Sequence, residues 1–126
     1  MLEISRELLD EARNIHRESI IIDAHCDTVL QLAPRKGREE WKTRSLIERG
    51  EFGHIDIPRL FEGGVTCQFF AIYVEGIYKP ERATERALEL ISTLYTELEK
   101  ASDKTIIVDK HEDIIKAKRR GKIAIL

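Results

Sequence analysis

The sequence predicts an α/β fold in which short parallel β-strands alternate with α-helices. Three observations support this fold class: apolar residues at helical spacing, short β-branched runs between the helical segments, and turn residues at the junctions. Such alternation is typical of βαβ units, whose strands pair in parallel. The chain has 126 residues, of which 42% are hydrophobic and 35% charged. This balance can build a packed core, and we expect one domain spanning 1–126.

The first half of the chain is predicted to contain a helix, two strands and a charged loop. Apolar residues at helical spacing predict an amphipathic helix over about 3–17. The apolar run at 20–22 predicts a strand buried on both faces. Residues 33–53 are highly charged and predict a long loop over one end of the fold. A short helical turn at 58–62 then leads to the strongest predicted strand, at 65–74.

The second half repeats the alternation of helix and strand. The longest predicted helix covers about 80–101, and a short strand follows at 105–108. Asp109 is a plausible N-cap for the next helix, which runs to Arg119 and Arg120 and is followed by Gly121 as its C′ residue. Residues 122–126 predict another buried strand.

Charge and composition exclude several classes of partner. The 21 Lys and Arg residues against 23 Asp and Glu residues give a net charge of −2, so we expect no nucleic acid or anionic membrane as a partner. The N-terminus lacks the apolar segment of a signal peptide, which predicts a cytoplasmic location. No apolar run approaches the roughly 20 residues of a membrane-spanning helix. Two cysteines are too few for a disulfide scaffold.

The residues that follow the first predicted strand carry the strongest chemical signal. Side chains alternate along an extended chain, so His25 and Asp27 share a face with Asp23, and Cys26 points away. An imidazole and a carboxylate suit Zn²⁺ and similar divalent ions, and the carboxyl ends of parallel strands are where α/β proteins place their chemistry. On spacing alone, a His–Asp hydrogen bond, or a helix cap formed by Asp27, is favoured over a metal site.

Two sequence blocks together resemble a known family. IIDAHCD at 21–27 and IDIPRLFEGGVTCQFF at 55–70 are similar to the N-terminal part of the membrane (renal-type) dipeptidases, zinc metallopeptidases of the amidohydrolase-like barrel group. The resemblance runs over essentially the whole chain. It implies the N-terminal part of a TIM-like (β/α)8 barrel. Such a barrel needs about 250 residues, so the domain is expected to be incomplete.

The resemblance also implies site residues and a cofactor. The family's first-strand ligands of one zinc in a two-zinc site fall on His25 and Asp27, and Asp23 is a weaker candidate for orienting a ligand. The family's bridging glutamate, its other histidine ligands and its substrate-contacting and proton-handling residues have no counterpart here. No catalytic residue is therefore expected within this chain. The implied cofactor is Zn²⁺, two ions per complete site, although other divalent metals remain possible.

The implied reaction is hydrolysis of the amide bond of a dipeptide substrate by a metal-activated hydroxide. Two protein ligands fall short of the four that zinc normally takes, so we expect the isolated chain to be inactive. We interpret it as an N-terminal fragment of a dipeptidase-like barrel. Open sheet edges would also favour a homo-oligomer.

The second block has a structural interpretation beside the functional one. Asp56 is expected to cap the turn at 58–62, and Arg59 to pair with Asp56 or Glu62. Gly63 and Gly64 can provide a tight turn with positive φ. Buried in a strand, Gln68 would need a hydrogen-bond partner.

Two other function classes remain open at this point. TatD-type nucleases and PHP-type phosphoesterases also begin with metal ligands on the first strand, but they use a His-x-His pair, whereas this chain has Asp27 at the second position. A small non-enzymatic α/β module complete at 126 residues is the third class.

Overall fold

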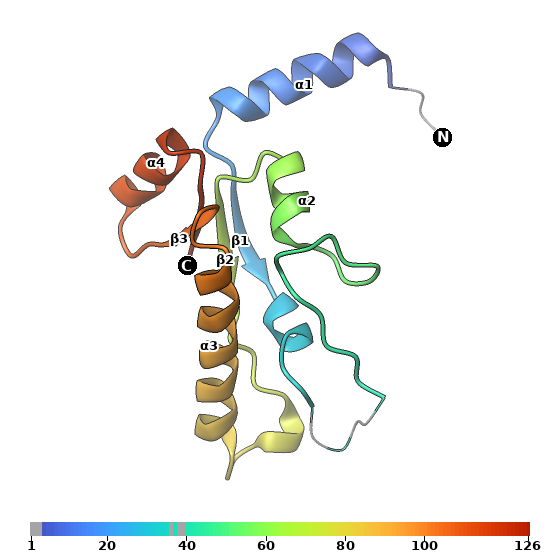
Figure 1. Ribbon diagram of the computed structural model, residues 1–126, viewed down its shortest axis with the longest axis vertical. Helices are drawn as coiled ribbons and strands as arrows, with labels where there is room; N and C mark the ends of the chain where they lie inside the picture. The colour runs from blue at the N-terminus through green and yellow to red at the C-terminus, as the bar shows by residue number, and fades with distance from the viewer. Residues whose placement is uncertain (1–3, 36, 38–39) are drawn as a thin grey trace.

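The computed structural model describes residues 4–35, 37 and 40–126 (Figure 1). Its elements follow the predicted alternation, and the α/β class is confirmed. In chain order they are α1 (Arg6–Glu18), β1 (Ile22–Cys26), η1 (Thr28–Gln31), α2 (Ile57–Glu62), β2 (Cys67–Phe70), η2 (Gly76–Tyr78), α3 (Ala83–Lys100), β3 (Thr105–Ile107), α4 (His111–Arg119) and β4 (Ile123–Ile125).

The strands form one parallel sheet, but their order in space differs from their order in the chain. The sheet runs β1-β2-β4-β3, and every adjacent pair is parallel. β4 lies between β2 and β3 because Ala124 pairs with Cys67 on one side and with Ile106 on the other. The chain therefore forms the outer strand β3 first, continues through α4, and then returns to form β4 beside β2.

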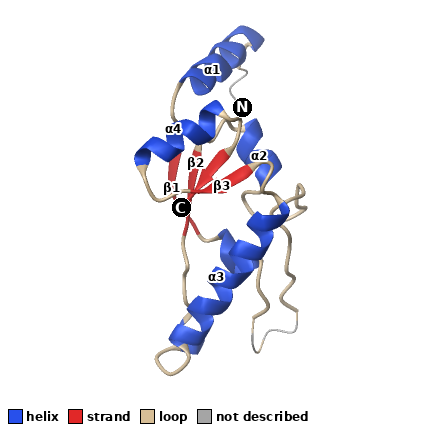
Figure 2. Cartoon of the chain, turned by 60° about the vertical axis from the view of Figure 1, so that its left-hand side comes forward, coloured by secondary structure: helices blue, strands red, loops and turns tan. Residues whose placement is uncertain are grey.

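Helices cover both faces of this sheet (Figure 2). On one face, Leu90 and Leu94 of α3 belong to a core cluster with Phe70, Ile123 and Ile125. On the other face, α4 packs against β2 and β4 in a second cluster made by Cys67, Val108, Ile114, Ala117 and Ala124. Alternate residues of β4 enter different clusters, as the pleat of a strand requires. β2 and β4 are therefore largely buried beneath helices.

β1 is less buried than the apolar run at 20–22 predicts. Ile20 is 45% exposed and Ile22 is 48% exposed, so the expectation of burial on both faces is wrong here. The reason is the sheet order, which places β1 at an edge with a neighbouring strand on one side only. Burial of a parallel strand depends on neighbours that the local sequence does not specify.

α1 projects away from the sheet (Figure 1), and His16 near its end contacts the turn that follows α2. None of its 13 residues is buried. The Nδ1–H of His16 donates a hydrogen bond to the carbonyl of Gly63 at 3.0 Å. Gly64 has φ +72°, and a Cβ there would lie 3.1 Å from Cβ of His16. Both the turn and the close approach of α1 therefore favour glycine.

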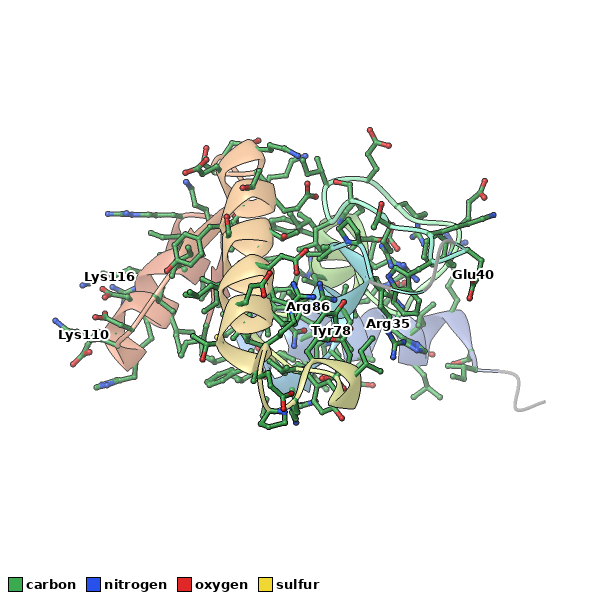
Figure 3. All side chains as sticks on the ribbon, turned by 90° about the horizontal axis from the view of Figure 1, so that it is seen from below. Arg35, Glu40, Tyr78, Arg86, Lys110 and Lys116 are labelled. Carbon is green, nitrogen blue, oxygen red and sulfur yellow. The ribbon has the colours of Figure 1, made fainter. Side chains whose placement is uncertain are left out.

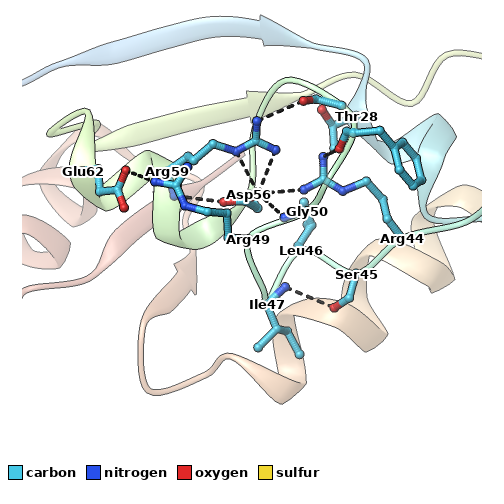
Figure 4. A network of polar contacts seen from close by, with 12 residues as sticks. Thr28, Arg44, Ser45, Leu46, Ile47, Arg49, Gly50, Asp56, Arg59 and Glu62 are labelled. Atoms are coloured by element: carbon cyan, nitrogen blue, oxygen red, sulfur yellow. Dashed lines mark hydrogen bonds and ion pairs between the residues drawn. The ribbon is translucent and has the colours of Figure 1, made fainter.

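The long loop between η1 and α2 is held by the buried carboxylate of Asp56 (Figure 4). Asp56 is 0% exposed, and its Oδ2 accepts hydrogen bonds from Arg44 at 2.9 Å and from Nε of Arg59 at 2.8 Å. The backbone N–H groups of Gly50 and Arg59 also donate to Asp56, both at 2.9 Å. The last of these bonds is the predicted N-cap of α2. The predicted pairing of Arg59 with Asp56 is also confirmed.

These contacts set the ionisation of Asp56. Burial by itself would raise the pKa of the carboxyl group, because it disfavours the charged form. The hydrogen bonds from Arg59 and Gly50 outweigh this effect and lower the pKa to about 2. Asp56 is therefore ionised in the folded protein at neutral pH.

Two predicted details are wrong for local reasons. The N-cap of α4 is Lys110 rather than Asp109, and it makes no side-chain capping bond. The strand predicted at 65–74 is shorter, Cys67–Phe70, because the chain leaves the sheet after pairing with β1 and β4. The predicted Gly121 at the end of α4 is confirmed by its φ of +66°.

None of the helices formed by the described residues combines the length and the apolar character that a membrane crossing requires.

Replacing Asp56 with Asn should lower the free energy of unfolding by about 3 kcal/mol, because it leaves the buried guanidinium of Arg44 without its counter-charge. Urea unfolding followed by circular dichroism measures this change. The matched control is Glu62→Gln, which removes an exposed ion pair with Arg49 and should cost less than about 1 kcal/mol. Equal losses in the two variants would contradict the role assigned to Asp56.

The stability should also depend on pH through Asp56. Its folded pKa is lowered from 3.8 to about 2, so its stabilising contribution is complete above about pH 4 and is lost as the pH falls through about 2. The contribution is about 2 kcal/mol. Glu75 and Glu97, whose pKa values are also lowered, act in the same direction. Unfolding measured from pH 7 to pH 2 should show a weaker pH dependence in Asp56→Asn than in the original chain.

Candidate metal-binding site at the end of β1

His25 and Asp27 lie together at the carboxyl end of β1, as the sequence predicts. Nε2 of His25 is 3.3 Å from Oδ1 of Asp27, and the side chains are 69% and 53% exposed. Asp27 follows the last residue of β1 and precedes η1, so the pair spans the point where the extended chain turns. The imidazole of His25 and the carboxylate of Asp27 are therefore both accessible from solvent at the strand end.

A register irregularity in β1 shapes this end of the strand. Asp23 pairs with Gln68 and Cys26 pairs with Phe70, so three residue steps on β1 oppose two on β2. The alternation from which the sequence analysis placed Asp23 and His25 on one face is interrupted there. Extra residues of this kind bend a strand and change the direction of its side chains, and they are common next to functional sites.

Asp23 acts on the backbone of His25 in this structure. Its Oδ1 accepts a hydrogen bond from the N–H of His25 at 3.1 Å. A short carboxylate that binds the N–H two residues ahead is the usual local substitute for a ladder hydrogen bond. The structure thus gives Asp23 a contact that positions His25 through the main chain, whereas the sequence suggested a role in orienting a metal ligand.

Asp27 occupies the N-cap position of η1 without using its carboxylate as a cap. The side chain makes no capping hydrogen bond, and the backbone carbonyl of Asp27 accepts from the N–H of Leu30 at 3.0 Å. Asp27 therefore lies at a helix-capping position, but its carboxylate does not cap the helix. Its carboxylate is directed toward His25 instead.

Cys26 points away from the pair, as predicted. Its thiol interacts with the hydroxyl of Thr28 at 3.0 Å, and the side chain packs against the core cluster under α3. The thiol is thus engaged in the interior. Cys67 is fully buried in β2, and burial raises the pKa of its thiol.

The spacing of His25 and Asp27 fits one small divalent ion. With zinc–nitrogen and zinc–oxygen distances near 2.0–2.1 Å, two ligands of a tetrahedral ion lie about 3.3 Å apart. The observed separation of 3.3 Å matches this value. Among the described residues, no group of three or more His, Cys, Asp or Glu side chains could hold a metal. The described residues therefore supply two donors, half of the usual set for zinc.

The other histidines lie away from this strand end. His54 is exposed in the loop before α2. His111 is 82% exposed beside Glu112, in the first turn of α4. His16 is bound to the carbonyl of Gly63. The structure brings none of the three to the end of β1.

A buried ion pair follows β2 and was missed by the sequence analysis. Arg86, 1% exposed, donates to both carboxylate oxygens of Glu75, at 3.0 and 3.1 Å. Its guanidinium also donates to the carbonyl of Pro34 at 2.9 Å and lies over the ring of Tyr78 (Figure 3). Burial alone would raise the pKa of Glu75, but the bonds from Arg86 lower it. The spacing of Arg86 from Leu90, one helical turn along the apolar stripe, was the available signal.

This ion pair restrains the chain that follows η1. Pro34 lies three residues beyond Gln31, the last residue of η1, and the bond from Arg86 ties it to α3. η1 itself packs against α3. Contacts with α3 therefore fix the segment that begins at Asp27.

Comparisons with known proteins agree with this architecture. The model of the family described as membrane dipeptidase (peptidase family M19) matches residues 9–126. The probable dipeptidase PvdM from Pseudomonas aeruginosa has a similar fold, with a TM-score of 0.73 and 15% identity, over 97% of this chain and 30% of that chain. Dipeptidase AC, a metallopeptidase of family M19, gives a TM-score of 0.69 and 24% identity, over 85% of this chain and 33% of that chain. The chain thus spans about a third of the length of each.

Proposed function

The chain belongs to the membrane dipeptidase family, peptidase family M19, and from this premise we propose that it carries part of the site of a zinc-dependent dipeptidase. In this proposal His25 and Asp27 are two ligands of one metal ion. The substrate is a dipeptide, and the reaction is hydrolysis of its amide bond. The fold supports the proposal, because it is similar to the folds of a probable dipeptidase and of a dipeptidase of family M19 over 97% and 85% of this chain.

The observation that supports the proposal best is the pairing of His25 with Asp27 at an exposed strand end. The 3.3 Å separation suits two ligands of one ion, and the exposed side chains can exchange water for metal. The Asp27 carboxylate is free of a capping role, and Asp23 fixes the backbone of His25. Imidazole nitrogen and carboxylate oxygen are both suitable ligands for a divalent ion.

Each side chain has a defined task in this scheme. His25 and Asp27 would hold a divalent ion at the carboxyl end of β1, and such an ion would activate a water molecule and polarise the scissile carbonyl. Asp23 keeps His25 in position by accepting a hydrogen bond from its N–H. The described part of the chain contributes two ligands, so further ligands must come from other residues.

The other function classes receive no support from the family match. That match spans residues 9–126 and includes the second sequence block, which has no place in TatD-type or PHP-type phosphoesterases. A small non-enzymatic module is likewise disfavoured, because the similarity covers nearly the whole chain.

The proposed ligands can be tested by metal titration. Zn²⁺ or Co²⁺ should bind the chain weakly at one site per chain, because two donors hold the ion without completing its coordination. Isothermal titration calorimetry should show this binding lost in His25→Ala and in Asp27→Ala. The matched control is His111→Ala, which removes another exposed histidine beside a carboxylate. Loss of binding in the control, with retention in His25→Ala, would place the metal elsewhere.

The proposed reaction can be tested by assaying dipeptide hydrolysis with added Zn²⁺. We expect the 126-residue chain alone to release amine at the uncatalysed rate, because a two-ligand ion cannot form a binuclear site. A longer chain that supplies further ligands should be active, and His25→Ala should abolish that activity. Full activity of the chain alone would refute the two-ligand assignment. Hydrolysis of phosphodiesters instead of dipeptides would favour the phosphoesterase class.

A further inference from the structure

The His25–Asp27 pair offers a divalent ion half of a coordination shell. Its donor atoms lie 3.3 Å apart, which is the separation of two ligands on one tetrahedral ion. Within the described residues, no third His, Cys, Asp or Glu side chain joins the pair in a group that could hold a metal. Zinc in a closed protein site takes four ligands, so two positions on the ion are left for donors from elsewhere.

The charge of the ion is also only half balanced by one pair. A metal-bound carboxylate supplies one negative charge and a metal-bound neutral imidazole supplies none, whereas Zn²⁺ carries two positive charges. A second His25–Asp27 pair would cancel the remaining positive charge and add one nitrogen and one oxygen ligand. The same two side chains, taken twice, therefore satisfy both the ligand number and the charge of zinc.

The position of the pair in the sheet leaves its donors open to another molecule. β1 is an edge strand, with β2 on one side and no strand on the other side among the described residues. The side chains of His25 and Asp27 are 69% and 53% exposed at the carboxyl end of this strand. A second copy of the chain can therefore bring its own pair to the same ion.

Asp23 protects this edge against ordinary pairing with another strand. Its carboxylate accepts from the N–H of His25 at 3.1 Å, so a neighbouring strand cannot use that N–H. The register irregularity between Asp23 and Cys26 lies in the same segment. Charged side chains and irregularities of this kind discourage edge-to-edge pairing of sheets. Two copies are therefore expected to meet through a bound ion rather than through a continued sheet.

We propose that two copies of this chain share one zinc ion, to which each copy supplies His25 and Asp27. The proposal rests on the proposed function, because it uses the same two ligands, and it identifies the source of the other two when no other protein is present. The same surface of both copies takes part, so the dimer has a two-fold axis through the ion. Four protein ligands leave no open position for water, so the shared ion is structural and the dimer does not hydrolyse dipeptides.

Sedimentation velocity at a fixed chain concentration tests the proposal directly. Without metal the chain should sediment as a monomer. Half an equivalent of Zn²⁺ per chain should double the mass, and EDTA should restore the monomer. An excess of Zn²⁺ should reverse the dimer in part, because every chain can then hold an ion of its own. His25→Ala and Asp27→Ala should each remain monomeric at all ratios of metal to chain.

The matched control is His111→Ala, which removes an imidazole that is 82% exposed beside Glu112. This variant should dimerise as the original chain does, and circular dichroism verifies that each variant is folded. Mg²⁺, which prefers six oxygen ligands, should not produce the dimer. A dimer that persists in EDTA or in His25→Ala, or that is lost in His111→Ala, would overturn the proposal.

Failure of this proposal can be distinguished from failure of the proposed function by measuring Zn²⁺ binding in the same samples by calorimetry. Binding that depends on His25 but leaves the chain monomeric at every ratio would overturn the sharing of the ion and leave the two ligands in place. Absence of Zn²⁺ binding by the original chain would overturn both.

Discussion

The buried carboxylate of Asp56 is the interaction on which the path of the loop after β1 depends. Two guanidinium groups and two backbone N–H groups converge on it, and none of its surface is exposed. A buried charge is costly unless its lone pairs are satisfied, so this arrangement is stable only when all four donors are in place. The bonds to Asp56 therefore hold Arg44, Gly50 and the start of α2 together as one unit.

That unit positions groups well beyond Asp56 itself. The N–H of Arg44 donates to the carbonyl of Gln31 at 2.9 Å, and this bond connects the loop to η1 and hence to Asp27. Gly53 has φ +83°, and a Cβ there would lie 2.2 Å from Nη1 of Arg44 and 2.3 Å from Oε1 of Gln31, so the close approach needs glycine. A second carboxylate, Glu97 of α3, accepts from the N–H of Leu46 at 2.9 Å. The long charged loop is therefore ordered by buried carboxylates together with Leu46, which lies in the apolar core cluster.

Much of the site could be predicted from local sequence, and the remainder depended on distant neighbours. The closeness of His25 to Asp27 and the inward direction of Cys26 followed from the geometry of an extended chain, and both are confirmed. The register irregularity of β1 did not follow, because it arises from pairing with β2, about 45 residues away. Gln68 shows the same dependence: besides the carbonyl of the adjacent Phe69, its side-chain N–H group reaches the distant carbonyl of Asp23 at 3.4 Å.

The sequence by itself determined the fold class, the number and order of the main strands and helices, the cap of α2 and the family. These features depend on spacing, turn chemistry and motif residues that lie within a few positions of one another. Tertiary structure alone decided the spatial order β1-β2-β4-β3, the exposure of Ile20 and Ile22, and the burial of Arg86 with Glu75. The physical reason is that burial and pairing are properties of two surfaces in contact. The local sequence of a strand or around a charged side chain does not specify which surface it will contact.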